Sequence, residues 1–306
     1  MKIYINKINE DWIVDRFKTE WEKSHKNLVA NNIIESDIVW IISPWTFKSL
    51  PTRNLRMKKI LCTVHHLDLE NFSSSDYKQF LNVDKYVDYY HVLSSKTEEK
   101  LRKLSNKEIF VQPFWADSKL WYKKENRSEI KKNLGFNESD FLIGSFQRDT
   151  EGKDLTSPKL IKGPDIFVEL LEKHFDKNNI KIVLTGKRRQ FIIKKLNEKG
   201  IKYKYFEMVN NNDLNDLYNI LDLYIVSSRL EGGPQQILEC ALSKTPIVST
   251  DVGIAKYILS EESIYDVEKF EKSRPNITKA YENAQNYKIP NGFIYFEKLF
   301  DEIYQR

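Results

Sequence analysis

The chain has 306 residues, of which 41% are hydrophobic and 30% charged, and a net charge of +5. This length favours two domains of about 150 residues each, and the composition excludes a disordered chain. No stretch approaches the roughly 20 apolar residues of a membrane span, and the mild positive charge favours anionic ligands without requiring nucleic acid.

Short apolar runs alternate with helical patterns over the first third of the chain. We expect strands at 2–6, 38–42, 59–64, 89–93 and 109–112, and helices at about 10–24, 75–86 and 95–104. Such alternation is typical of an α/β domain whose parallel sheet has helices on both faces. The first strand lacks the apolar segment of a signal peptide. Cys62 and Cys240 lie in apolar contexts, which indicates reduced core residues of a cytoplasmic protein.

A second alternating region follows a polar, lysine-rich break. We expect residues 1–113 to form the first domain, 114–135 a linker carrying one short helix, 136–285 a second domain, and 286–306 a helix that crosses back onto the first domain. In the second domain strands are predicted at 141–146, 181–185, 202–206, 223–226 and 246–250, and helices at 163–174, 188–198 and 212–220.

Glu231 and Glu239 stand on either side of a Gly-Gly-Pro turn that follows the apolar strand 223–226. The carboxyl end of such a strand is where open α/β sheets bind ligands. Two carboxylates on one wall can each accept hydrogen bonds from a pair of hydroxyls, which suits a ribose and a hexose, and the N–H groups that begin the next helix favour an anion between them. The alternative is that Glu231 caps the helix and Glu239 is a solvated helical residue.

This segment, together with 245–248 and 251–253, resembles the signature of the retaining glycosyltransferases of family 4, in which two glutamates are separated by seven residues. A weaker similarity covers 143–148, 162–165 and 183–186. The resemblance implies the GT-B fold, with two Rossmann-like domains facing a central cleft. It also implies transfer of a sugar from a nucleotide-diphosphate sugar to a glycan, glycolipid or other hydroxyl acceptor, with retention of configuration.

The resemblance also implies a role for each matching residue. Arg148 and Lys162 would neutralise the diphosphate, Glu231 would hold the sugar hydroxyls and Glu239 the ribose, and His65 would face the donor sugar. Backbone contacts near the sugar and phosphate would come from Gly232, Gly233, Pro234 and Gln235. The base would lie against the loops that hold Thr185, Gly186, Lys187, Met208 and Val209.

Two positions remain open within that assignment. The segment 149–158 intervenes between Arg148 and the family's Lys-Gly step, so Lys153 competes with Lys162 for the phosphate. The adjacent His66 competes with His65 for the place at the end of its strand. Arg148 and Lys162 could also be ordinary surface cations, and either histidine could simply cap a strand.

We expect no metal ion and no cofactor, because the chain lacks the Asp-x-Asp ligand pair of metal-dependent transferases. The expected partners are the nucleotide-sugar donor and a carbohydrate or lipid-linked acceptor. The basic segment 53–59 suggests weak peripheral contact at the inner membrane face of a cytoplasmic protein. The alternatives are a non-catalytic nucleotide-sugar-binding protein, a nucleotide-sugar epimerase and a DNA-base glycosyltransferase of the same fold.

Overall fold

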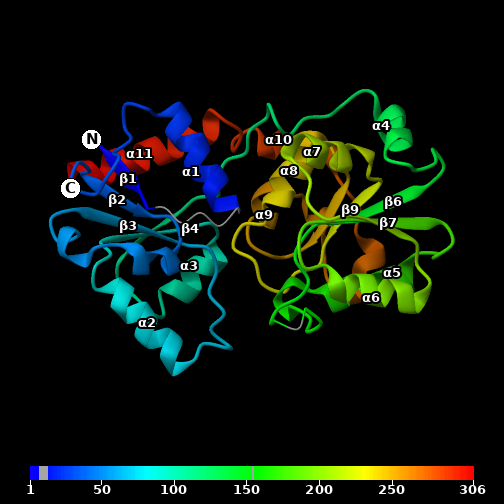
Figure 1. The fold of residues 1–306 in the computed structure, drawn as a ribbon, viewed down its shortest axis with the longest axis horizontal. Helices are drawn as coiled ribbons and strands as arrows, with labels where there is room; N and C mark the ends of the chain where they lie inside the picture. The colour runs from blue at the N-terminus through cyan, green and yellow to red at the C-terminus, as the bar shows by residue number, and fades with distance from the viewer. Residues whose placement is uncertain (7–12, 154) are drawn as a thin grey trace. The chain divides into compact units, whose positions relative to one another are not determined.

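The computed structural model describes residues 1–6, 13–153 and 155–306 (Figure 1). The chain forms two compact units. Unit 1 comprises Met1–Trp115 and Ile289–Arg306, and unit 2 comprises Ala116–Lys288. The helix predicted at about 10–24 lies in part outside the described residues.

Unit 1 is built on a five-stranded parallel sheet with the order β1-β2-β3-β4-β5. Its strands are β1 (Ile3–Ile5), β2 (Ile38–Ile41), β3 (Lys59–Val64), β4 (Tyr89–Val92) and β5 (Glu108–Val111). Every residue of β2 is buried, which explains why it is apolar throughout rather than alternating. All five predicted strands are present, with ends that differ by one residue or so.

Helices cover both faces of this sheet (Figure 1). On one side lie α1 (Ile13–Ser24) and α11 (Asn291–Gln305), and on the other α2 (Ser74–Asp84) and α3 (Ser95–Leu101). Two 3-10 helices, η1 (Pro44–Ser49) and η2 (Thr52–Asn54), connect β2 to β3. The final helix therefore belongs to the same unit as the first five strands.

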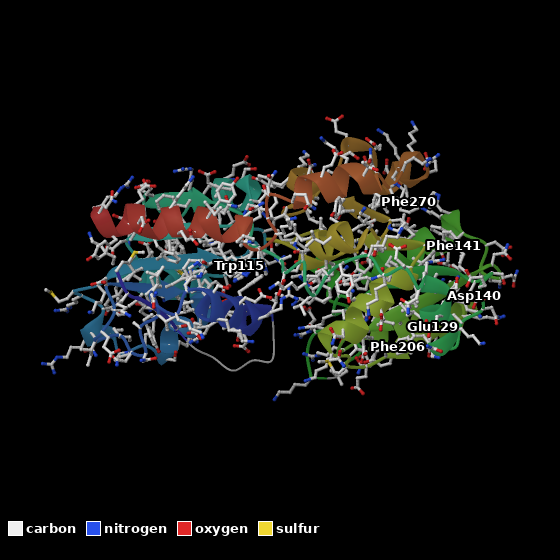
Figure 2. All side chains as sticks on the ribbon, turned by 90° about the horizontal axis from the view of Figure 1, so that it is seen from above. Trp115, Glu129, Asp140, Phe141, Phe206 and Phe270 are labelled. Carbon is white, nitrogen blue, oxygen red and sulfur yellow. The ribbon has the colours of Figure 1, made fainter. Side chains whose placement is uncertain are left out.

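Aromatic side chains fill the layer between the sheet and the pair α1 and α11. Trp21 of α1 and Trp40 of β2 meet edge to face, with ring centroids 6.3 Å apart, and Phe296 of α11 stacks on Phe114 at 5.5 Å. Trp115, labelled in Figure 2, has none of its surface exposed. Burial of such large rings stabilises unit 1. Because the rings come both from the chain before unit 2 and from the chain after it, both segments belong to unit 1.

A series of buried, hydrogen-bonded polar groups crosses this aromatic layer. The Trp40 indole donates to the Thr63 hydroxyl at 2.8 Å, and that hydroxyl bonds His91 Nδ1 at 2.9 Å. His91 Nε2 then donates to the Gln112 carbonyl oxygen at 2.7 Å. Burial lowers the pKa of His91 to about 3, and the imidazole is therefore neutral.

This neutral imidazole makes the stability of unit 1 depend on pH. Because the pKa of His91 is lower in the folded chain than its ordinary value of 6.5, the stabilisation is complete above pH 6.5 and is lost as the pH falls toward 3. We expect the free energy of unfolding to fall by about 1.4 kcal/mol per pH unit from this group. Denaturant titrations followed by tryptophan fluorescence would measure it, since every tryptophan except Trp121 falls within unit 1.

The matched variant for this measurement is His91→Gln, which keeps hydrogen-bonding capacity but cannot titrate. Between pH 6.5 and 5 the free energy of unfolding should fall more steeply with pH for the wild-type protein than for the variant. The difference in slope should correspond to about one additional proton bound on unfolding. Parallel pH profiles for the two proteins would show that His91 does not carry the effect.

Unit 2 contains a six-stranded parallel sheet with the order β11-β10-β9-β6-β7-β8. Its strands are β6 (Phe141–Ser145), β7 (Ile180–Thr185), β8 (Tyr203–Phe206), β9 (Leu223–Val226), β10 (Ile247–Thr250) and β11 (Ile264–Tyr265). The chain runs outward from β6 through β7 to β8 and then returns to the other side of β6 with β9. The order of the strands therefore reverses between β6 and β9.

Helices pack on both faces of this second sheet. They are α4 (Arg127–Asn133), α5 (Pro164–His174), α6 (Gln190–Lys199), α7 (Asn211–Ile220), α8 (Gln235–Ser243), α9 (Ala255–Ile258) and α10 (Ile277–Ala284), with the 3-10 helices η3 (Leu160–Lys162), η4 (Glu261–Ser263) and η5 (Val267–Lys272). Figure 1 shows α5 and α6 on one face and α7 and α8 on the other. The sequence reasoning did not foresee β11, α9 or α10.

The segment expected to be a linker, 114–135, is part of the packed structure instead. Trp121 is fully buried against Tyr218, with ring centroids 5.8 Å apart. Lys124 and Arg127 form ion pairs with carboxylates at 2.5 and 2.7 Å, which belong to Asp216 and Asp222. The lysine-rich composition hid these two anchors, because their carboxylate partners lie far along the chain. Unit 2 thus begins at Ala116 and ends at Lys288.

Candidate functional site

The carboxyl edge of the unit 2 sheet gathers polar side chains where the strand order reverses. Gln147 follows β6 and Ser228 follows β9, and the Ser228 hydroxyl donates to Gln147 Oε1 at 3.4 Å. The Gln147 amide in turn donates to the carbonyl oxygen of Lys162 at 2.9 Å. In open α/β sheets this reversal point is the place where ligands bind. The hydrogen bonds therefore join three segments around the expected ligand position.

Glu231 and Lys162 form an ion pair at this position. Lys162 Nζ lies 2.5 Å from Glu231 Oε1, and the two side chains are only 18% and 10% exposed. The Ser228 hydroxyl adds a hydrogen bond of 3.1 Å to the same oxygen. The sequence predicted both residues, but with separate roles toward sugar and phosphate. It did not predict that the two side chains form an ion pair with each other.

Gly163 lets this ion pair form, because it brings η3 against the end of β9. Its φ is +61°, a conformation that other residues rarely adopt, and a Cβ there would lie 1.8 Å from the Ser227 carbonyl oxygen. The Ser227 hydroxyl donates back to the Gly163 carbonyl at 2.8 Å. Lys162, the residue before this glycine, is thereby directed toward the loop that holds Glu231.

Glu239 is buried within α8 and has a phenol as its partner. Its carboxylate accepts a hydrogen bond of 2.7 Å from the Tyr218 hydroxyl, and only 4% of the residue is exposed. The alternative of a solvated helical residue is therefore wrong. The sequence analysis missed Tyr218, although its place in the helix before β9 brings it beside α8.

The Gly-Gly-Pro turn between the two glutamates packs closely on the loop after β10. A Cβ at Gly253 would lie 2.4 Å from the Gly232 carbonyl oxygen, so only glycine fits there. Pro234 occupies the N-cap position of α8, and the alternative that Glu231 caps this helix is wrong as well. Gly233 is half-buried, and Gln235 is 6% exposed.

Four cations act on one another at this edge of the sheet, namely Arg148, Lys159, Lys162 and Arg188, whereas two were predicted. The Arg148 guanidinium donates to the Thr150 carbonyl at 2.8 Å, and its pKa is lowered by burial and by the nearby charge of Arg188. Burial, and next the charges of Lys162 and Arg148, lower the pKa of Lys159. Lys153, the competitor for the phosphate, is exposed. Like charges this close destabilise one another, which is typical of sites that bind anions.

A buried ion pair anchors the Arg148 loop to the start of α6. Arg189 Nε lies 3.0 Å from Asp149 Oδ2, and both side chains are inaccessible to solvent. Asp149 also accepts the Phe191 N–H at 3.2 Å, and Arg189 donates to the Ser145 hydroxyl at 3.2 Å. Burial raises the pKa of Asp149 to about 6 against the opposing effect of Arg189. The sequence analysis predicted neither residue, because sequence alone does not distinguish either of them from the other charged residues.

The residues predicted to contact the base lie on the other side of β6. Thr185 is buried at the end of β7, and the Gly186 carbonyl accepts a hydrogen bond of 2.9 Å from Tyr205. Lys187 continues this loop, while Met208, 57% exposed, and the half-buried Val209 follow β8. Because β7 and β8 lie on the side of β6 away from β9, these residues flank the glutamate loop rather than join it.

His65 lies in unit 1, at the end of β3. Its Nε2 donates to the Ile42 carbonyl at 2.9 Å and lies 3.2 Å from the Ser43 hydroxyl, so this nitrogen carries a hydrogen. The ring lies 5.9 Å from that of Trp45, which is 36% exposed and which the sequence analysis did not single out. The expected role of His65 or His66 toward a donor sugar stays a prediction.

Among the residues that the structure describes, no three His, Cys, Asp or Glu side chains are arranged to hold a metal ion. None of the described helices combines the length and the apolar composition that crossing a membrane requires.

Comparison with solved structures defines the fold class as GT-B. HepE from Anabaena, solved with UDP and glucose, aligns with a TM-score of 0.78 at 13% identity, over 98% of this chain and 100% of that one. Sucrose-phosphate synthase from Thermosynechococcus elongatus aligns with a TM-score of 0.71 at 13% identity, over 98% of this chain and 81% of that one. Both parallel-sheet units are thus Rossmann-like halves of a GT-B fold, as the sequence predicted.

The chain belongs to the family of glycosyl transferases group 1, whose model matches residues 126–288. This match spans nearly all of unit 2, including both glutamates and the four cations. A search of curated protein sequences finds no match. The protein is therefore a glycosyltransferase.

The close approach at Gly163 can be tested with a matched pair of substitutions. Gly163→Ala and Gly200→Ala both place a Cβ at positive φ, which costs about 1–2 kcal/mol. Only the first also collides with backbone, because nothing lies within 4 Å of a Cβ at Gly200. We expect Gly163→Ala to lower the free energy of unfolding by roughly 3 kcal/mol or more, measured by denaturant titration. Equal losses for the two variants would contradict the packing described here.

Proposed function

We propose that this protein moves a sugar from a nucleotide-diphosphate sugar to a hydroxyl acceptor, with retention of configuration and without a metal ion. The observation that carries the proposal is the ion pair of Glu231 with Lys162, together with the buried Glu239 held by Tyr218, where the strand order of unit 2 reverses. Membership of the glycosyl transferases group 1 supports the reaction type. The spacing of the glutamates supports a place in family 4.

The two carboxylates suit the two sugars of such a donor. Glu239, which Tyr218 holds inside α8, would accept hydrogen bonds from the ribose hydroxyls. Glu231, at the tip of the loop after β9, would accept those of the transferred sugar. Between them, the N–H group of Gln235 begins α8 and those of Gly232 and Gly233 lie in the turn before it, and a helix start favours the diphosphate.

The cations would take the place that a metal ion has in other transferases. As the bond between the sugar and the diphosphate breaks, negative charge grows on the departing phosphate, and fixed cations stabilise it. We infer that Arg148 and Lys162 contribute this charge, because Lys162 is paired with Glu231 and Arg148 follows β6 at the same edge of the sheet. The partial burial of Lys162 strengthens its effect, since solvent screens it less.

Retention of configuration follows if the acceptor attacks from the face that the diphosphate leaves. The acceptor oxygen then bonds the anomeric carbon as the bond from that carbon to the phosphate oxygen breaks, and the phosphate takes the acceptor proton. No nucleophilic side chain is needed for this route. His65 would assist by hydrogen bonding to the sugar, although its Nε2 is already committed to Ile42.

The acceptor we favour is a glycan or a glycolipid, and we do not expect nucleic acid. A lipid-linked acceptor would agree with a cytoplasmic enzyme that touches the inner membrane face. The exposed residues Arg53, Arg56 and Met57 of unit 1 would make that contact.

Release of nucleoside diphosphate tests the proposal directly. We would incubate the protein with UDP-, GDP-, ADP- and TDP-sugars, with EDTA present and without acceptor, and measure the diphosphate that is released. We expect slow hydrolysis of one donor, abolished by Arg148→Ala, because the leaving group then lacks a cation. If the protein binds nucleotide tightly but hydrolyses no donor, with or without candidate acceptors, the catalytic role is wrong and a binding protein is favoured.

The two glutamates should differ in what their loss changes. Glu231→Gln should reduce turnover about a hundredfold or more while nucleoside diphosphate affinity is kept, because it alters the contact with the reacting sugar. Glu239→Gln should instead weaken nucleotide binding about tenfold, because neutral hydrogen bonds are weaker than charged ones. Steady-state kinetics and titration calorimetry measure the two effects. A Glu231→Gln enzyme with wild-type turnover would contradict the sugar contact.

A further inference from the structure

Arg229 joins the loop that holds Glu231 to the first turn of α5. Its guanidinium donates to both oxygens of the Asp165 carboxylate, at 2.8 Å to Oδ1 and 2.6 Å to Oδ2. One of its terminal nitrogens, Nη1, also donates to the Leu160 carbonyl at 2.9 Å. Such a two-point contact between an arginine and a carboxylate fixes the direction of both side chains and not only their separation.

The backbone around Arg229 makes the same connection. The N–H groups of Arg229 and Leu230 both donate to the Ile161 carbonyl, at 2.9 and 3.0 Å. One residue farther along each segment, Glu231 and Lys162 form the ion pair of the candidate site. The contacts of Arg229 therefore lie directly beside the two charges that are proposed to meet the donor.

The Glu231 loop is attached on its other side as well, to the end of β10. The Thr250 hydroxyl donates to the Ser228 carbonyl at 2.6 Å. This bond fixes the loop relative to β10, whereas Arg229 fixes it relative to η3, which ends at Lys162. The separation between the glutamate and the lysine therefore depends on the attachment that Arg229 makes.

The pair of Arg229 and Asp165 is too exposed to hold the fold of unit 2 by itself. The two side chains are 45% and 38% exposed, and an ion pair in contact with water contributes little to stability. What a two-point pair adds in such a place is geometry, because it restricts where the loop can lie. A displacement of about 1 Å in an enzyme site can lower the rate about a hundredfold, so this restriction matters for the reaction.

We propose that Arg229 and Asp165 are positioning residues of the donor site. They form a clamp that keeps the Glu231 carboxylate and the Lys162 ammonium at the separation that the reaction needs. This inference rests on the proposed function, since it concerns the same donor site. In this role neither side chain touches the donor, because Arg229 acts through Glu231 and Asp165 acts through Arg229. The two residues should therefore matter equally, and not independently of each other.

Donor hydrolysis by paired variants tests the clamp. Arg229→Ala and Asp165→Ala should each lower turnover about tenfold, because Glu231 is then misplaced, and should leave affinity for the preferred nucleoside diphosphate within about threefold. The double variant should be no slower than either single variant, because each alone opens the clamp. Lys173→Ala is the matched control, because it breaks another exposed ion pair of α5, 2.5 Å from Glu169, and it should leave turnover unchanged.

The Asp165 variants decide whether Arg229 acts in a clamp or binds the donor itself. A donor-binding Arg229 would be released by Asp165→Ala, so this variant would keep or gain turnover while Arg229→Ala lost nucleotide affinity. With the clamp, both variants lose turnover. Asp165→Glu keeps the carboxylate and should recover part of the turnover that Asp165→Ala loses. A wild-type rate for Asp165→Ala would overturn the inference.

Hydrogen exchange of the ligand-free protein measures the clamp without any donor. The amides of Arg229 and Leu230, which bond Ile161, should exchange about tenfold faster in Asp165→Ala than in the wild type. Lys173→Ala should leave their exchange unchanged. The melting temperatures of these variants should stay close to that of the wild type, since the pair is exposed. Unchanged exchange in Asp165→Ala would show that the carboxylate does not hold the loop, and the clamp would be wrong.

The outcomes also separate this inference from the proposed function. If the wild-type protein neither binds a nucleoside diphosphate nor hydrolyses any donor, the donor site itself is wrong, and the role of the clamp fails with it. If the wild type hydrolyses a donor, and Arg229→Ala and Asp165→Ala hydrolyse it equally fast, only the inference about the clamp is overturned.

Discussion

The ion pair between Lys162 and Glu231 is the interaction on which the arrangement of the candidate site depends. It links two segments that are far apart in the sequence, and it can form only because Gly163 brings η3 within contact of the end of β9. The strand order places both segments at the point where the sheet reverses. A buried pair of this kind adds little to stability by itself, but it fixes where each charge lies.

Around this pair, other buried polar groups hold the loops at the carboxyl edge of unit 2. Arg189 and Asp149 attach the loop after β6 to α6, and Tyr218 holds Glu239 inside α8. Each group has its partner within the same unit, so the site is organised before any ligand binds. In a transferase of this family, such preorganisation lowers the barrier because the charges need not move during the reaction.

The predicted strands agree with the structure because each is a short apolar run, and such runs are visible in one stretch of sequence. The two glutamates were found for a similar reason, since their spacing and the Gly-Gly-Pro turn are local. The linker was misjudged because Lys124 and Arg127 look solvated until their carboxylate partners are known. Tyr218 and Arg189 were missed because nothing next to them in the sequence distinguishes them from other polar residues.

By itself the sequence determined the α/β class, most of the strands and helices, and the loop that holds Glu231 and Glu239. These features follow from local composition and periodicity. Only the tertiary structure decided that Lys162 pairs with Glu231, that Glu239 is buried against Tyr218, and that Arg229 pairs with Asp165. The physical reason is that charge and burial depend on neighbours brought together by the strand order, and these neighbours are distant along the chain.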